Sequence, residues 1–537
     1  MQKVLTAEQM REVDRLTTER YGIPSILLME NAAHAAARII TEKLGGSVKG
    51  KSILILCGPG NNGGDGAALG RLLSLDKADV SIILLGSTSN SKADALANFS
   101  AARSTVGSLR RFESIDDWNE WYELAEKEWD VVVDAIIGTG LTRPLTGWIA
   151  EVLEQISPDN AASRYLRTRL TFSIDVPTGL NADDSESQGP VFDADATITF
   201  TSPKRANVLP PACRFGGELT VAFIGSNRNL IDEVDSQLYV SERWDAEEWY
   251  CSADFSEDSY KNKRGHLLVM AGSESYSGAA VLCGNAAMRS GVGLVTIATP
   301  KSSKASVASR VLPEVMVLGV AETENGAVSE IAFDEIQELL GKVDSVAIGS
   351  GISWDESTKR FVQKVIENRR RPILVDADAL NLLSPFAGFA ANGESEYLLI
   401  LTPHEGEFMR LLGSDDKEVI KDRIAAVRDF ATKHNVILVL KGERVLIGEP
   451  GGKVVVNPTG NSGLGKAGNG DTLTGIIAGF VAQAVQFKID IFETVVAAVY
   501  VAGMAGDVAE KKYGKRVMTA SDVRECLADV FESLAGN

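Results

Sequence analysis

Apolar and polar positions alternate along the chain in a repeating pattern of strand, loop and helix. In the first half, four runs are rich in Ile, Val and Leu and are followed by small or turn residues: SILILCG, VSIILLG, VVVDAIIG and LTFSIDVP. Helical patterns such as GDGAALGRLLSL and DDWNEWYELAEKEW lie between these runs. Short apolar runs that alternate with helical segments predict a parallel α/β sheet with helices on both faces.

This pattern stops near residue 226 and resumes near residue 264. The intervening stretch is polar, acidic and aperiodic, so we interpret residues 229–262 as a connection between domains. Beyond it, the runs HLLVMAGS, LVTIATP, SVAIGSG, PILVDADAL, YLLILTPHEGE and VILVLKGERVLIG predict a second α/β domain. The sequence therefore predicts domains at residues 1–228 and 263–537, without a visible repeat between them.

Composition narrows the class of protein. The chain has 537 residues, which is too many for one ordinary hydrophobic core and favours two large domains. Its formal net charge of -19 argues against a nucleic-acid partner, because phosphate contacts need clustered Lys and Arg. The five cysteines include no C-x-x-C pair, which is typical of reduced thiols in a cytoplasmic protein. The charged, helical start is no signal peptide, and no uncharged apolar run of about 18 residues predicts a membrane span.

A glycine-rich loop, GPGNNGGDG, follows the first apolar run. Gly58, Gly60 and Gly63 match the G-x-G-x-x-G spacing of dinucleotide-binding folds, a weak signal by itself. A nicotinamide-dependent dehydrogenase would also place an acidic residue about 20 positions further on, at the end of the next strand. Here the run VSIILLG continues into STSN, so the sequence disfavours a dehydrogenase.

Polar side chains recur where three predicted strands end. They are Asn61, Asn62 and Asp65 after the first strand, Asp134 within another, and Asp175 and Thr178 after a third. Each one alone could be a turn residue, a helix cap or a buried hydrogen-bonding group. Their recurrence favours one shared site, because parallel strands present their carboxyl ends at the same edge of the sheet. Such oxygens suit a hard cation, and glycine loops let backbone approach a ligand closely.

The order and spacing of NNGGDG, DAIIGTG, DVPTGLNAD and SPKRANVLPP, with LTAEQMREVDR and LMENAA before them, resemble the YjeF N-terminal family of NAD(P)H-hydrate epimerases. The resemblance implies a Rossmann-like three-layer domain, a potassium ion held by Asn62, Asp134 and Thr178, and Asp175 as the acid/base carboxylate. It also implies that the hydrated dinucleotide contacts Asp175 and two loops, made of Asn61, Asn62, Gly63, Gly64 and Asp65 and of Gly138, Thr139, Gly140, Leu141, Thr142, Arg143 and Pro144. DVPTGLNAD has Thr178 where the family more often has serine, which keeps the hydroxyl.

The second half contains one false motif and one stronger one. GNSGLGKA almost matches the Walker A pattern, but Ala467 stands where a hydroxyl should bind magnesium, so we reject a P-loop. AGNGD then opens a helix whose free N–H groups would stabilise an anionic phosphate. Asp471 in it is either a helix cap or a base beside a reacting phosphoryl group. Its context resembles ribokinase-like enzymes, whose aspartate accepts the proton of the attacking hydroxyl.

More specifically, GHLLVMAGSESYSGAA, IGSGIS, VDADALNLL, LTPHEGEFMRLL and GLGKAGNGDTLTG are similar to the ADP-dependent NAD(P)H-hydrate dehydratases. The similarity implies substrate contacts at Ala279, Gly351, His404 and Asp471, and nucleotide contacts at Lys441, Gly442, Glu443, Arg444, Val445 and Gly470. His404 alone would more often be structural, but its place after a strand favours ligand contact. Asp376 and Asp378 could assist magnesium, yet helix capping is the preferred interpretation. Ser350 stands where proline is usual and Val445 where threonine is common.

Together the resemblances imply a cytoplasmic repair enzyme for hydrated nicotinamide cofactors. Its first domain would interconvert the R and S epimers of NADHX and NADPHX. Its second domain would dehydrate the S epimer with ADP as its co-substrate, giving AMP and phosphate. Potassium would serve the first domain and magnesium the second, and we expect a homo-oligomer with no nucleic-acid or membrane partner. The alternative is a vitamin or sugar kinase fused to a non-catalytic binding or scaffold domain.

Overall fold

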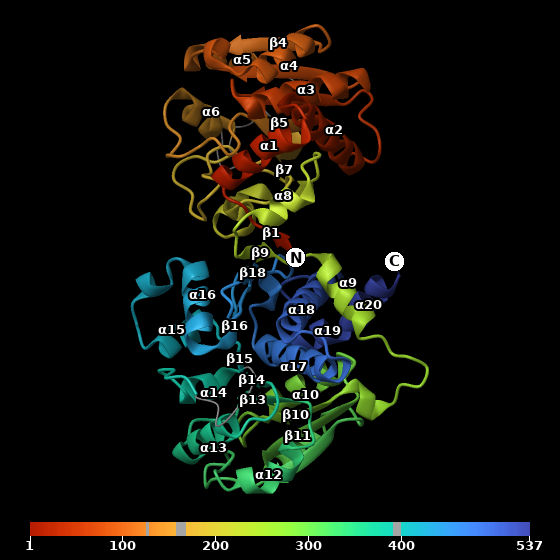
Figure 1. Cartoon of the computed structure of the whole chain (residues 1–537), viewed down its shortest axis with the longest axis vertical. Coiled ribbons are helices and arrows are strands. Elements are labelled where there is room, and N and C mark those ends of the chain that lie inside the picture. The colour runs from red at the N-terminus through yellow and green to blue at the C-terminus, as the bar shows by residue number, and fades with distance from the viewer. Residues whose placement is uncertain (125–127, 157–167, 390–398, 537) are drawn as a thin grey trace. The chain divides into compact units, whose positions relative to one another are not determined.

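The computed structural model describes residues 1–124, 128–156, 168–389 and 399–536. The chain divides into two compact units, Lys3–Ser236 and Gln237–Asn537, the second of which also includes Met1 and Gln2. Each unit is built on one β-sheet with helices packed against it (Figure 1). The predicted α/β class of both halves is therefore confirmed.

The N-terminal unit contains a seven-stranded sheet in the order β4-β3-β2-β5-β6-β7-β8, and every neighbouring pair is parallel. The strands are β2 (Ser52–Cys57), β3 (Asp79–Leu85), β4 (Ser108–Phe112), β5 (Trp129–Ala135), β6 (Thr168–Ile174), β7 (Ala196–Phe200) and β8 (Glu218–Ala222). The helices are α1 (Ala7–Tyr21), α2 (Ser25–Lys43), α3 (Asn61–Leu75), α4 (Ala93–Arg103), α5 (Ile115–Leu124), α6 (Trp148–Ile156), α7 (Arg205–Val208) and α8 (Arg228–Glu233).

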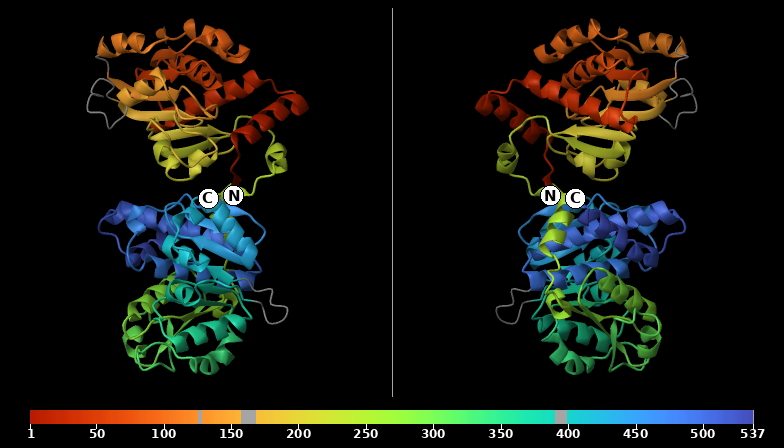
Figure 2. Two further views of the ribbon diagram at one scale, coloured as in Figure 1. Left: turned by 90° about the vertical axis from the view of Figure 1, so that its left-hand side faces the viewer. Right: turned by 90° about the vertical axis from the view of Figure 1, so that its right-hand side faces the viewer.

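Both faces of this sheet are buried, as a parallel sheet requires. Ile53 and Ile55 of β2 pack into the core beneath α2 and α3, whereas Leu54 and Leu56 pack into the core on the opposite face. Figure 2 shows the helices that cover the sheet. The continuous apolar run of β2 thus follows from burial on both sides, with successive side chains pointing to opposite faces.

The C-terminal unit has a larger sheet in the order β1-β9-β18-β17-β16-β15-β14-β13-β10-β11-β12. Strands β10 to β16 are parallel to one another, whereas β17 runs antiparallel to both β16 and β18. The strands are β1 (Gln2–Lys3), β9 (Leu238–Val240), β10 (His266–Met270), β11 (Leu294–Pro300), β12 (Met316–Val320), β13 (Ser345–Ile348), β14 (Ile373–Val375), β15 (Leu399–Leu401), β16 (Val436–Leu440), β17 (Leu446–Gly448) and β18 (Val454–Val456).

The helices of this unit are α9 (Arg243–Ser252), α10 (Ser277–Arg289), α11 (Lys304–Ala308), α12 (Ala332–Leu340), α13 (Glu356–Glu367), α14 (Ala377–Leu382), α15 (Glu405–Leu412), α16 (Arg423–His434), α17 (Asn469–Phe487), α18 (Ile491–Tyr513), α19 (Ala520–Glu525) and α20 (Leu527–Ala535). The long helices α17 and α18 pack against each other and against α9, α10, α19 and α20 (Figure 1). α10 approaches α17 closely, because a Cβ at Gly475 would lie 2.1 Å from the carbonyl oxygen of Cys283. This contact fixes the beginning of α17 beside the strand ends.

The predicted connection at residues 229–262 is not aperiodic, and that prediction was wrong. α8 belongs to the N-terminal unit, whereas β9 pairs in parallel with β18 of the C-terminal sheet. In α9, Trp249 stacks on Phe480 with ring centroids 3.8 Å apart. These few core contacts are separated by polar and acidic residues, so they leave no regular apolar pattern in the sequence.

α18 is the one helix in the described parts of the chain that is long and apolar enough to cross a membrane by length and composition. About two thirds of its apolar window, 67%, is buried inside the protein. Its buried residues include Val495, Val499 and Val501, which belong to the main core of the C-terminal unit. Its apolar character is therefore explained by packing between neighbouring helices.

Candidate functional sites

The glycine loop after β2 is shaped by close packing of the chain against itself. A Cβ at Gly58 would lie 2.1 Å from the carbonyl oxygen of Ile136, and one at Gly63 would lie 1.7 Å from that of Gly58. Gly63 and Gly64 are buried, whereas Asn61, Asn62 and Asp65 are exposed or partly exposed. The fold therefore requires glycine at 58 and 63, and the three polar side chains are the ones that a ligand could reach.

Asp134 is fully buried at the carboxyl end of β5. Its oxygens accept hydrogen bonds from the backbone N–H of Ile136 (3.1 Å), the hydroxyl of Ser173 (2.9 Å), and the N–H and hydroxyl of Thr178 (2.8 and 2.6 Å). All four donors are neutral. Burial raises the pKa of Asp134 although these hydrogen bonds oppose the shift. A buried carboxylate with neutral partners is a suitable ligand for a cation.

Asp175 follows β6 in the left-handed backbone region, with φ of 69°. Its Oδ1 accepts hydrogen bonds from the ammonium of Lys204 (2.6 Å) and from the hydroxyl of Thr199 (3.0 Å). The side chain of Lys204 is only 2% exposed and that of Asp175 is 16% exposed. Asn207 also donates to the carbonyl oxygen of Asp175 (3.2 Å). The surrounding hydrogen bonds thus hold a strained backbone in place, a feature common at functional sites.

The predicted residues of three strand ends meet at Gly138. A Cβ built there would lie 3.1 Å from Oδ2 of Asp175 and 3.2 Å from Oδ1 of Asn62. The amide nitrogen of Asn62 is buried and has no hydrogen-bond partner. The structure therefore brings Asn62 and Asp175 together. The rest of the 138–144 loop is more open, with Gly140, Thr142, Arg143 and Pro144 exposed.

Two further carboxylates, Asp14 and Asp65, lie close enough to the Lys204–Asp175 ion pair to interact with its charges. Burial raises the pKa of Asp14 on α1 to about 6, with Lys204 opposing the shift and Asp175 adding to it. Burial also raises the pKa of Asp65 well above its usual value, and the charges of Asp175 and Asp14 add to that shift. Lys204 thus balances only part of the negative charge, and a carboxyl group with a raised pKa keeps its proton to a higher pH than usual.

Sequence reasoning missed Asp14, Thr199 and Lys204 as individual site residues. Lys204 follows the end of β7 in the same way that Asp175 follows β6. The rule that polar residues after parallel strands share one edge of the sheet would have pointed to Lys204. The run ATITF, however, was not recognised as a strand. Asp14 lies on a helix far away in the sequence, and only the tertiary structure brings it to the site.

In the C-terminal unit, Asp471 lies in the first turn of α17 and lines a cavity of about 620 Å³. The predicted substrate contacts Ala279 and Gly351 line the same cavity. Burial raises the pKa of Asp471 to about 6, and the charge of Asp376 adds to the shift while that of Lys441 opposes it. Asp471 is not the N-cap residue, which is Gly468. The geometry thus favours the interpretation of Asp471 as a base over that of a helix cap.

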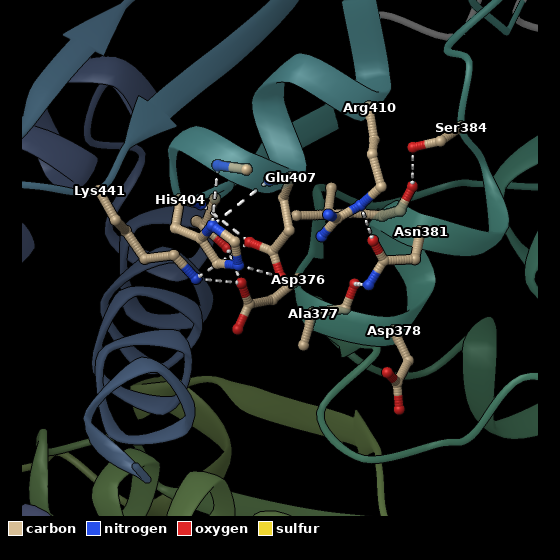
Figure 3. Close-up of polar contacts among 12 residues, drawn as sticks. Asp376, Ala377, Asp378, Asn381, Ser384, His404, Glu407, Arg410 and Lys441 are labelled. Carbon is tan, nitrogen blue, oxygen red and sulfur yellow. Dashed lines mark hydrogen bonds and ion pairs between the residues drawn. The ribbon is translucent and has the colours of Figure 1, made fainter. Parts of the chain in front are cut away.

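Lys441 lies beneath the beginning of α17, where its ammonium would be 3.7 Å from a Cβ at Gly470. It binds Oδ1 of the buried Asp376 at 2.7 Å and lies 3.8 Å from Glu407 (Figure 3). Burial opposes the charge of Lys441, but the two carboxylates outweigh it and raise its pKa. The predicted nucleotide contacts Lys441 and Gly470 are therefore adjacent, and the lysine is held charged.

His404 is the N-cap of α15. Its Nδ1 accepts hydrogen bonds from the N–H groups of Gly406 (3.0 Å) and Glu407 (3.3 Å). The backbone N–H of His404 donates to the Glu407 carboxylate (2.8 Å). The histidine side chain is 55% exposed, and a β-bridge links residue 404 to Lys441. His404 therefore has a structural role as a helix cap. Its ring is also exposed enough for a ligand to reach it. His404 does not line the cavity that contains Asp471.

The preferred interpretation of Asp376 and Asp378 as helix caps was wrong. Asp376 occupies the N-cap position of α14 but makes no capping hydrogen bond with its side chain. Instead its carboxylate binds Lys441 and the hydroxyls of Thr402 and Thr474 (both 2.8 Å). Asp378 accepts hydrogen bonds from the N–H of Ser353 (3.0 Å) and the indole of Trp354 (2.7 Å). Long-range partners compete successfully with the local cap in both cases.

The predicted nucleotide loop, residues 441–445, joins β16 to β17. Gly442 has φ of 158° and Arg444 has φ of 55°. Arg423 of α16 donates to the carbonyl oxygen of Glu443 (3.1 Å), and its Nε and Nη2 atoms are buried without a hydrogen-bond partner. Sequence reasoning also missed this arginine. Val445 is partly buried and packs against the core, so it contributes no hydrogen bond through its side chain.

Within the described ranges, no group of three or more His, Cys, Asp or Glu side chains is arranged to hold a metal ion. The five cysteines are free thiols, four buried and Cys251 exposed.

Two family models match the chain. The model described as NAD(P)H-hydrate dehydratase matches residues 267–528, and that of the YjeF-related protein N-terminus matches residues 25–206. Two similar full-length relatives are named bifunctional NAD(P)H-hydrate repair enzyme Nnr. The relative from Moorella thermoacetica is 35% identical over 99% of this chain and 97% of its own length. The relative from Thermofilum pendens is 33% identical over the same shares.

A solved structure also resembles part of this chain. It is the ADP/ATP-dependent NAD(P)H-hydrate dehydratase from Bacillus subtilis, co-crystallized with ATP/Mg2+. The two chains are 28% identical, and the match has a TM-score of 0.48 and covers 55% of this chain and 98% of that one.

The Lys204–Asp175 pair generates a prediction about stability. Lys204→Met should lower the free energy of unfolding of the N-terminal unit by about 3 kcal/mol, because it leaves a partly buried carboxylate without its cation. Adding Asp175→Asn should recover part of this loss. We would measure the amide hydrogen exchange of β6 and β7 in the full chain across a urea series. If the two substitutions change the free energy of unfolding additively, Lys204 and Asp175 are not energetically coupled and the prediction is wrong.

Proposed function

The chain belongs to the family of bifunctional NAD(P)H-hydrate repair enzymes, and from this premise we propose the chemical role of each site. The N-terminal unit interconverts the R and S epimers of hydrated NADH and NADPH. The C-terminal unit returns the S epimer to the reduced cofactor with the use of a nucleotide. The observation that carries the proposal is the pair of sites at the strand ends, each with a carboxylate of raised pKa beside a lysine–aspartate ion pair.

Epimerisation requires a proton to leave and return at the C6 hydroxyl, which sits beside the ring nitrogen. Removing this proton lets the C6–N1 bond open to an aldehyde, and closure on the other face gives the other epimer. We assign the proton transfer to Oδ2 of Asp175, because Oδ1 is engaged by Lys204 and Thr199. Asp14 or Asp65, whose pKa values are raised, would donate the opposing proton at the ring nitrogen.

Potassium in this unit is part of the proposal, and the residues fit such an ion. Asp134 is fully buried with neutral donors only, and the hydroxyl of Thr178 lies between Asp134 and the carbonyl oxygen of Ile137 (3.1 Å). Together with Oδ1 of Asn62, these atoms are the hard oxygen ligands that such a cation prefers. When bound, the ion would neutralise Asp134 and hold the substrate loop.

In the C-terminal unit, Asp471 would accept the proton of the C6 hydroxyl. The oxygen then attacks the terminal phosphoryl group of ADP, and AMP leaves. Phosphate departs from C6 as the C5–H proton passes to water and the C5=C6 bond forms. The N–H groups at the beginning of α17 and the ammonium of Lys441 would stabilise the charge on the phosphates. His404 and residues 442–445 complete the proposed ligand contacts.

Magnesium does not have a dedicated carboxylate site near α17. Within the described residues, no cluster of three or more His, Cys, Asp or Glu side chains is arranged to hold a metal ion. We infer that the ion arrives with the nucleotide phosphates, as Mg²⁺ usually does. The expected homo-oligomer, the cytoplasmic location and the absence of nucleic-acid or membrane partners stay predictions from the sequence, as do the domain boundaries 1–228 and 263–537.

Recovery of the reduced cofactor tests the two roles together. Purified protein with both epimers of hydrated NADH, Mg²⁺, K⁺ and ADP should restore the near-ultraviolet absorbance completely. Asp175→Asn should stop near the amount of S epimer supplied, and Asp471→Asn should lower the rate by at least about 100-fold because the base is lost. A parallel reaction with ATP identifies the donor. A stable phosphorylated product in place of NADH would overturn the dehydratase assignment in favour of a kinase.

The pH dependence of the dehydratase follows from Asp471. The deprotonated carboxylate is the active form, and its pKa is raised to about 6, so the rate should fall about ten-fold per unit as pH drops below 6. The pure S epimer serves as substrate, which makes the rate independent of the N-terminal unit. Lys441→Met removes a charge that lowers the pKa of Asp471. In this variant the fall in rate at acid pH should therefore begin at a higher pH than in the wild type. A flat profile between pH 5 and 7 would contradict the role of Asp471.

The potassium site has a readout that does not need catalysis. K⁺ should raise the melting temperature of the wild-type protein relative to Li⁺ at equal ionic strength, because binding stabilises the folded state. Asp134→Asn should lose this difference, whereas Asp130→Asn, a substitution on the same strand at the other end, should keep it. Equal melting temperatures in the two salts would remove potassium from the proposal.

A further inference from the structure

Two large aromatic side chains are exposed at the cavity that contains Asp471. Tyr276 is 59% exposed and Trp354 is 64% exposed, and both line the cavity. Aromatic rings of this size normally contribute to cores and interfaces, where each buries about 150–250 Å². Their exposure beside a carboxylate with a catalytic role calls for a ligand that covers them.

Both rings are positioned by specific contacts. Asp378 accepts hydrogen bonds from the indole N–H of Trp354 (2.7 Å) and from the N–H of Ser353 (3.0 Å), whose φ is 70°. Asp378 itself is visible in Figure 3, where its carboxylate points away from the Lys441 pair. The indole therefore has a fixed orientation before any ligand binds, which lowers the entropic cost of binding.

Gly351 brings the second ring close to the first. Its φ is 64°, and a Cβ there would lie 2.9 Å from Cβ of Tyr276 and 3.0 Å from Cβ of Ala279. No larger residue fits at 351 without displacing the tyrosine. The segment that carries Trp354 thus packs directly on the beginning of α10, where Tyr276 is the N-cap residue. The two aromatic side chains therefore flank one cavity from two different loops.

We propose that Tyr276 and Trp354 bind the hydrated nicotinamide ring by packing against its flat, conjugated side. This inference rests on the proposed role of Asp471 at the C6 hydroxyl. Because Asp471 lines the same cavity, the ring that bears this hydroxyl must lie within hydrogen-bond reach of it and therefore near both aromatics. Hydration across C5=C6 leaves the C2=C3 bond conjugated with the ring nitrogen and the carboxamide. That planar, uncharged group is a suitable partner for an aromatic face.

Steady-state kinetics with the S epimer tests this assignment. Trp354→Ala and Tyr276→Ala should each raise KM for the hydrated cofactor by about ten-fold, the effect expected for loss of one stacking contact. KM for the nucleotide and kcat should change less than about two-fold, because Asp471 and Lys441 are untouched. Trp354→Phe keeps an aromatic face and should recover most of the affinity.

The chain offers matched controls. Trp244 is also 64% exposed and Tyr260 is 56% exposed, and neither lines the cavity. Trp244→Ala and Tyr260→Ala should leave KM for the hydrated cofactor within about two-fold of wild type, since they remove equally exposed rings. An unchanged nucleotide KM in every variant verifies that the site is folded.

Fluorescence provides a second measurement that needs no turnover. Hydrated NADH added without nucleotide should quench the tryptophan emission of the wild type and of Trp244→Phe, after correction for absorption by the ligand. Trp354→Phe should lose most of this quenching. An active wild type whose Trp354→Ala variant keeps its KM and its quenching would overturn this inference alone. A wild type that does not consume hydrated NADH with either nucleotide would overturn the proposed function beneath it.

Discussion

Each unit depends on one buried ion pair between a lysine and an aspartate at the carboxyl ends of its parallel strands. Lys204 lies 2.6 Å from Asp175 in the N-terminal unit, and Lys441 lies 2.7 Å from Asp376 in the C-terminal unit. A single lysine in a region of low dielectric cannot neutralise several carboxylates. Burial raises the pKa of the remaining ones, Asp14 and Asp65 in one unit and Asp471 in the other, and neighbouring carboxylates add to each shift.

The same arrangement separates structural from reactive groups. Asp376 accepts hydrogen bonds from Lys441 and two threonine hydroxyls, so its carboxylate holds the lysine in place. Asp471 lies nearby and lines the cavity, and its burial outweighs the hydrogen bond from Ser350 and the charge of Lys441. In the N-terminal unit both roles belong to one residue, Asp175. Its Oδ1 accepts the hydrogen bond of Lys204, whereas its Oδ2 faces Gly138. Positioning and proton transfer are thus assigned to different atoms.

Backbone strain accompanies these sites. Asp175, Ser353 and Arg444 have positive φ in the loops that follow or precede strand ends. Such conformations cost about 1 kcal/mol or more each and persist because surrounding contacts hold them. At Asp175 the contacts are the lysine and threonine hydrogen bonds, and at Ser353 they come from Asp378. The stability of each fold therefore supports a site geometry that the local sequence disfavours.

The sequence by itself determined the α/β class, the two-part organisation and most buried strands, because apolar runs such as SILILC and VILVL reflect burial on both faces of a sheet. It also pointed to Asp134, Asp175 and Asp471, since polar residues at strand ends converge by topology. The tertiary structure alone decided the partners of these groups. Lys204, Asp14 and Arg423 reach their sites from other elements, and Asp376 and Asp378 prefer distant donors to a local helix cap. Pairing across tens to hundreds of residues leaves no periodic signal along the chain, so only the folded structure reveals which charges are compensated and which remain reactive.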